Sequence, residues 1–88
     1  MNPTPLPILY VRSGSSRCRE AAQCLVDMGI SYLQKNIDRD PAAASTLARL
    51  STVRETPTLD WHGEVLVGFT SYELANFLQS LEVEMEDS

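Results

Sequence analysis

Cysteine and histidine are scarce in this sequence, and their scarcity excludes several classes of protein. Two cysteines and one histidine among 88 residues are too few for a disulfide scaffold or an obvious zinc site. Seven basic residues stand against twelve acidic ones, so the net charge of −5 argues against nucleic-acid and anionic-membrane partners. No apolar run approaches the roughly 20 residues that span a bilayer, and the N-terminus lacks a signal-peptide pattern. We therefore expect a cytoplasmic protein.

The spacing of apolar residues and of turn residues predicts one domain over residues 1–88 with the element order β-α-β-α-β-β-α. The expected strands cover residues 6–12, 30–37, 57–61 and 64–67, and the expected helices cover 17–28, 41–50 and 70–81. Residues 1–7 and the loop 51–56 should lack regular structure, and an acidic tail should fray from Glu82 onward. Right-handed crossovers then predict a four-stranded mixed sheet, with the first and last helices on one face and the middle helix on the other.

Three motifs in this order resemble the glutaredoxin family. Ile8 to Cys18 looks like the family's first strand and active-site loop, in which a basic residue and a glycine precede Cys-x-x-Cys. Glu55-Thr56-Pro57-Thr58-Leu59 resembles its Thr-Val-Pro segment, and Val67-Gly68-Phe69-Thr70-Ser71 resembles its Gly-Gly-Phe-Asp-Asp segment. The resemblance covers about residues 6–80 and implies a thioredoxin fold with a cis bond before Pro57.

The active-site motif departs from the family at its first cysteine. Ser15-Ser16-Arg17-Cys18 stands where Cys-x-x-Cys is expected, so Ser15 occupies the position of the nucleophile. A serine needs a general base, and the single histidine, His62, is expected in a distant hairpin turn. Ser15 is therefore interpreted mainly as a loop or helix-cap residue. A natural serine, a serine introduced for cysteine and a serine standing for selenocysteine would all give this sequence.

Cys18 takes the family's second cysteine position, one turn into the helix. The helix dipole and nearby arginines would favour its thiolate, while a half-buried packing role fits equally well. Cys24, six residues on, lies about 9 Å further along one helix, which is too far for a bridge to Cys18. Cys24 is therefore expected to pack in the core.

Three of the seven basic residues, Arg12, Arg17 and Arg19, lie near this loop and would suit an anionic partner such as glutathione, unless they are only scattered surface arginines. We expect a shallow groove for a thiol peptide. Its expected residues are Arg12, Ser15, Arg17, Thr56, Pro57, Gly68, Phe69, Thr70 and Ser71. Strand pairing with Thr56 would hold the peptide backbone, while the arginines and the helix start at Thr70-Ser71 would hold carboxylates.

The resemblance predicts a glutaredoxin-like thiol–disulfide redox protein with a degenerate S-x-x-C site, weak or inactive in exchange as written. It implies no bound cofactor, with glutathione or a thiol/disulfide protein as the partner. The alternatives are a non-catalytic module that binds a thiol peptide or protein, and a purely structural thioredoxin-fold domain.

Overall fold

The computed structural model describes residues 6–51 and 55–86, and the side chains only as far as Ser80. The first two strands are β1 (Ile8–Val11) and β2 (Leu33–Asn36), and the hairpin is formed by β3 (Thr58–Trp61) and β4 (Glu64–Val67). The helices are α1 (Ser16–Asp27), α2 (Pro41–Leu50) and α3 (Ser71–Glu86). The predicted element order is confirmed. The expected irregular N-terminus and the middle of the 51–56 loop lie outside the described residues.

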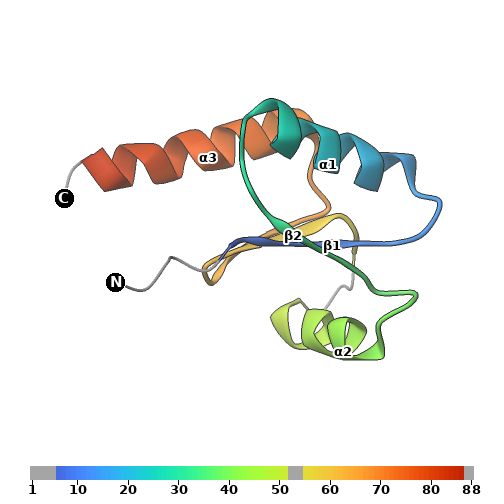
Figure 1. Cartoon of the computed structure of the whole chain (residues 1–88). Helices are drawn as coiled ribbons and strands as arrows, with labels where there is room; N and C mark the ends of the chain where they lie inside the picture. The colour runs from blue at the N-terminus through green and yellow to red at the C-terminus, as the bar shows by residue number, and fades with distance from the viewer. Residues whose placement is uncertain (1–5, 52–54, 87–88) are drawn as a thin grey trace.

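The four strands form one mixed sheet in the order β2-β1-β3-β4. β1 pairs parallel with β2 and antiparallel with β3, and β3 pairs antiparallel with β4. Helices α1 and α3 cover one face of the sheet and α2 covers the other, as Figure 1 shows. The predicted mixed sheet between helices is therefore confirmed, and the loops after β1 and β2 lie together at one edge of it.

Side-chain caps and glycines determine where the helices begin and end. Asp40 accepts hydrogen bonds from the amides of Ala42 and Ala43 and so caps α2. Thr70 and Glu73 form a reciprocal capping box at the start of α3. Gly29 follows α1 with a φ of 73°, a backbone conformation that favours glycine.

The alternation of side chains along β1 divides the core between the two faces of the sheet. Leu9 and Val11 belong to a cluster with Leu25 of α1 and Leu74 of α3. Tyr10 points to the other face, where it packs with Ala43 and Leu47 of α2. A strand buried on both faces positions the loop that follows it, and this loop carries Ser15.

Several elements differ in length from the sequence prediction. β1 covers residues 8–11 rather than 6–12, and β3 begins at Thr58 rather than at Pro57. β2 begins at Leu33 rather than at Ile30, because Ile30 and Tyr32 approach the core before the chain pairs with β1. α3 continues to Glu86 rather than ending at Leu81, so the expectation of fraying from Glu82 is wrong for residues 82–86. The segment 82–86 contains only valine, methionine and glutamate and no glycine or proline, so nothing in it interrupts a helix.

Candidate functional site

Ser15 caps the N-terminus of α1. Its backbone is extended, with φ −92° and ψ 119°, and its Oγ accepts a hydrogen bond from the amide of Cys18 at 3.2 Å. The Cys18 side chain is only 3% exposed and belongs to the core cluster beneath α1 and α3. The S-x-x-C motif therefore combines a capping hydroxyl at the surface with a thiol that faces the interior.

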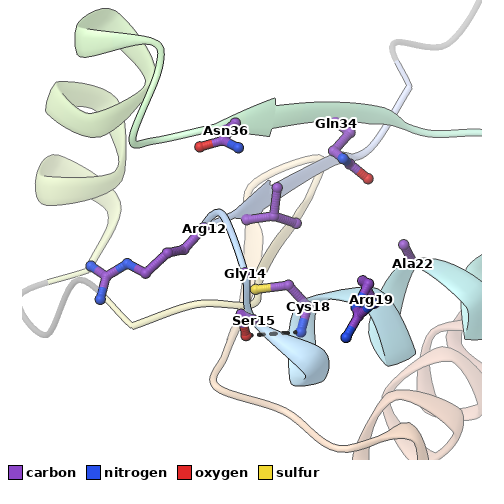
Figure 2. A pocket seen from close by; sticks show the side chains of 9 residues that line it. Arg12, Gly14, Ser15, Cys18, Arg19, Ala22, Gln34 and Asn36 are labelled. Carbon is purple, nitrogen blue, oxygen red and sulfur yellow. Dashed lines mark hydrogen bonds between the residues drawn. The ribbon is translucent and has the colours of Figure 1, made fainter.

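A hollow of about 130 Å³ lies beside this motif, between α1 and the carboxyl ends of β1 and β2. Figure 2 shows the Cys18 sulfur turned toward the loop around Gly14, with Gln34 and Asn36 projecting from β2 on the opposite wall. The lining residues are Val11, Arg12, Gly14, Ser15, Cys18, Arg19, Ala22, Gln34 and Asn36. The thiol therefore borders a small space with both polar and apolar lining on the β2 side of α1.

Arg12 does not point toward Ser15. Its guanidinium extends away from the motif in Figure 2 and lies 3.9 Å from an Asp38 carboxylate oxygen. Asp38 also accepts a hydrogen bond from the Ser13 amide at 3.1 Å, and the Asn36 amide donates to the Ser13 hydroxyl at 3.0 Å. The sequence prediction did not single out Asn36 or Asp38. The available signal was their position at and just after the carboxyl end of a strand parallel to β1, an end that must lie beside the motif.

The second group of predicted residues meets on the other side of the first turn of α1. The Thr56–Pro57 peptide bond is cis, and the Pro57 carbonyl accepts a hydrogen bond from the Gly68 amide at 2.8 Å. Arg17 in turn donates to the Gly68 carbonyl at 2.8 Å. A hollow of about 240 Å³ lies here, lined by Arg17, Glu20, Ala21, Phe69, Thr70 and Ser71. The predicted site residues therefore fall into two groups. Arg12 and Ser15 border the hollow beside β2. The group on the side of the turn after β4 consists of Arg17, Pro57, Gly68, Phe69, Thr70 and Ser71.

Gly68 occupies a position that favours glycine. Its φ is 55°, a left-handed conformation that residues with a side chain adopt less readily, and the Glu55 carboxylate lies against the place of a Cβ there. The turn after β4 therefore brings its backbone close to the segment that precedes Pro57. Phe69, only 2% exposed, anchors the same turn in the core.

No histidine lies beside Ser15. The sequence has a single histidine, His62, which lies in the β3–β4 turn with Gly63. Because β3 runs antiparallel to β1, with Tyr10 opposite Thr58 and Ile8 opposite Asp60, that turn lies at the opposite end of the sheet from Ser15. The hydroxyl can therefore cap the helix but lacks a histidine for activation.

Both cysteines are free thiols. The pKa of Cys24 is raised above its ordinary value, mainly by burial and in addition by the nearby carboxylate of Asp27. Burial, together with the charge of Asp60, likewise raises the pKa of Tyr10. Cys24 packs against the core cluster, as its predicted packing role requires.

The described part of the chain holds no group of three or more histidine, cysteine or carboxylate side chains that could bind a metal ion. None of the helices within residues 6–51 and 55–86 is long and apolar enough to cross a membrane.

Comparisons with solved structures agree on the architecture. The thioredoxin-like protein BC3987 matches with a TM-score of 0.70 and 24% identity, over 80% of this chain and 96% of its own. A point mutant of the same protein matches with a TM-score of 0.71 at the same identity, covering 82% and 97% of the two chains. A glutaredoxin from Archaeoglobus fulgidus matches with a TM-score of 0.75 and 14% identity, covering 85% and 87%. No family model and no curated protein matches the chain. The predicted glutaredoxin-like thioredoxin fold is therefore confirmed.

Proposed function

We propose that this chain is a glutaredoxin-like thiol–disulfide redox protein whose exchange activity is weak because serine occupies the position of the nucleophile. The observation that carries the proposal is Ser15 at the N-cap of α1, three residues before Cys18, within a thioredoxin fold. A thiol at such a position is activated by the free amides and the dipole at the helix start. A serine there lacks comparable acidity and stays protonated.

The remaining thiol of the motif does not replace the missing nucleophile. Cys18 is 3% exposed, so a disulfide substrate cannot reach its sulfur without a local movement of α1 or of the loop before it. Thiol–disulfide exchange requires a thiolate in line with the disulfide bond that it attacks. The chain as written should therefore react slowly with small disulfides.

A thiol introduced by Ser15→Cys would complete the chemistry. Its thiolate would attack one sulfur of a disulfide RSSR, form a mixed disulfide and release RS⁻. Either Cys18 or a glutathione thiolate would then attack the mixed disulfide. Attack by Cys18 releases the second RS⁻ and leaves an intramolecular disulfide, whereas attack by glutathione releases the introduced thiolate and forms the disulfide between glutathione and R. No bound cofactor is needed, and glutathione serves as the co-substrate.

The hollow between α1 and the turn after β4 is the proposed place for the peptide part of such a substrate. An extended thiol peptide would pair with the backbone at Thr56, and Gly68 and Phe69 would bound it beside Pro57. One donor of Arg17 is occupied by the Gly68 carbonyl, and its other N–H groups would bind a carboxylate. Binding should be weak and should weaken further with salt, because the contacts are largely ionic.

A reducing compartment such as the cytoplasm fits this proposal. Both cysteines are free, and a reducing environment keeps such thiols from forming disulfides.

The test is a glutathione-coupled assay with a small mixed disulfide. The unmodified chain should show little activity above background, and Ser15→Cys should raise the rate by at least tenfold. Ser15→Ala is the matched control, because it changes the same side chain without supplying a thiol. If the unmodified chain already equals the Ser15→Cys variant, the proposal fails.

A second candidate is a non-catalytic module that binds a thiol peptide or a protein partner, and the burial of Cys18 favours it. An NMR titration with reduced glutathione distinguishes a thiol-peptide ligand from a protein partner. Shifts confined to residues 12–18, 55–58 and 67–71 would support a glutathione groove. An absence of shifts at millimolar glutathione would leave a protein as the partner.

A further inference from the structure

A polar network fastens the loop that carries Ser15 to the loop that follows β2. The Ser13 amide donates to Asp38 Oδ2 at 3.1 Å, and the Asn36 Nδ2 donates to the Ser13 hydroxyl at 3.0 Å. The Asp38 amide donates back to Asn36 Oδ1 at 2.8 Å, which closes the network on itself. The two contacts to Ser13 join residues more than twenty positions apart and reach to within two residues of Ser15.

The same carboxylate lies beside the positive charge of Arg12. Arg12 Nε is 3.9 Å from Asp38 Oδ1, and the guanidinium points away from Ser15 (Figure 2). Arg12 immediately precedes the loop and has a side chain long enough to fold back over it. Asp38 instead holds this cation on the side of α2, where it is paired.

We propose that Asp38 and Asn36 are positioning residues, which fix the loop carrying Ser15 and keep the Arg12 guanidinium away from it. Their role in disulfide exchange depends on the proposed function, whereas their effect on the loop does not. Removal of the Asp38 charge should release Arg12 toward position 15, so that a thiolate there would be stabilised by one more cation.

The other charges near this loop are shared by all variants in the test. Within the described residues they include Arg39 and Asp40 beside Asp38, Arg17, Arg19, Glu20 and the Cys18 thiol on α1, Glu55 before β3, and Glu73 at the start of α3. Because none of these is altered, a change in the acidity of a thiol at position 15 reports on Asp38 and Arg12.

The experiment compares Ser15→Cys with Ser15→Cys/Asp38→Asn, both combined with Cys24→Ser. Alkylation by iodoacetamide is followed across pH by mass spectrometry, and trypsin separates position 15 from Cys18 by cleavage after Arg17. Asp38→Asn keeps an oxygen that can accept from Ser13 but removes the charge. We expect the midpoint of reaction at position 15 to fall by about half a pH unit, a threefold rise in thiolate below the midpoint.

Two controls attribute that shift to Arg12. Glu64→Gln removes one negative charge at the far end of the sheet, beside Trp61, and should leave the midpoint in place. Addition of Arg12→Met to the Asp38→Asn variant should abolish the fall. A midpoint unchanged by Asp38→Asn, or moved equally by Glu64→Gln, would overturn the proposal.

A second measurement uses the chain with Ser15 intact. Asp38→Ala removes the acceptor of the Ser13 amide, so hydrogen exchange at Ser13 should quicken several-fold while exchange in β1 stays the same. Unchanged exchange at Ser13 would also overturn the positioning role. The proposed function can fail separately: Ser15→Cys would then remain inactive although Asp38→Asn still lowers its midpoint.

Discussion

The Ser15 hydroxyl has a structural role at the position where the resemblance predicts a nucleophile. Its Oγ accepts a hydrogen bond from the Cys18 amide and so satisfies one of the N–H donors that every helix start leaves unpaired. A cysteine in the same place would be a weaker hydrogen-bond acceptor, because its acceptor is sulfur, but it would supply a reactive thiolate. Ser15 therefore supports the start of α1. A hydroxyl at this position favours stability over reactivity.

Cys24 provides a pH-dependent prediction at the scale of a single residue. Burial and Asp27 both raise its pKa, so the folded chain favours the neutral thiol. In the unfolded chain the thiol has its ordinary pKa of about 8.5, so as the pH rises it ionises there before it does in the folded chain. The contribution of this residue to stability is therefore complete below that value and is lost as the pH rises through the higher folded pKa.

We expect Cys24 in the folded chain to react with iodoacetamide more slowly at pH 8 than in urea. Asp27→Asn should move the reaction midpoint part of the way down, because burial, the larger cause, remains. Asp60→Asn, on β3, serves as the charge-matched control. A Cys24 midpoint equal in the folded and unfolded chains would contradict the assignment.

The first turn of α1 is the element on which the candidate site depends. It presents Arg17 to the turn after β4, and it presents Ser15 and Arg19 to the hollow beside β2. Neighbouring residues on a helix point in directions about 100° apart, so one turn serves two sides of the molecule. The site is therefore sensitive to fraying at this end of the helix.

Ser15→Ala tests the cap as a property of the helix. Loss of the acceptor for the Cys18 amide should lower the free energy of unfolding by about 1 kcal/mol. Ser16→Ala is the matched control, because Ser16 is the exposed first residue of α1 and its side chain makes no hydrogen bond among those described. Urea unfolding followed by circular dichroism measures both variants, and equal stabilities would show that Ser15 contributes no cap.

At the scale of the whole molecule, stability comes from two small clusters on opposite faces of one sheet. The cluster beneath α1 and α3 includes Cys18 and Phe69, so the core and the candidate site share side chains. The cluster beneath α2 is smaller and is centred on Tyr10 and Leu47. In a chain of this length each buried side chain is a large part of the net stability.

Substitutions of Leu25 and Val26, two neighbouring residues of α1, test which side of this helix faces the core. Leu25 is fully buried, whereas Val26 is 58% exposed. Leu25→Ala should lower the free energy of unfolding by about 2–5 kcal/mol, because it removes contacts and leaves a cavity. Val26→Ala should change it by no more than about 0.5 kcal/mol. Urea unfolding gives both values, and similar losses would contradict the observed orientation of α1.

Much of the fold could be predicted from local patterns. The caps at Asp40 and Thr70, the glycine after α1 and the His62-Gly63 turn each depend on residues a few positions apart. The apolar run within residues 6–12 indicated a strand, and the spacing of Ser15 and Cys18 placed both at one helix start. β2 and the end of α3 were misplaced by a few residues, because contacts with the core and helix continuation decide such boundaries.

The tertiary structure alone decided that the predicted site residues lie around two separate hollows. The sequence determined by itself that Ser15 stands three residues before Cys18, that three arginines lie close to it along the chain and that Pro57 follows the loop 51–56. It did not determine that Arg12 would pair with Asp38 or that Arg17 would bind the Gly68 carbonyl. These partners are 26 and 51 positions away, and they meet only because the parallel pairing of β1 with β2 and the return of β3 and β4 bring separate loops to one edge of the sheet.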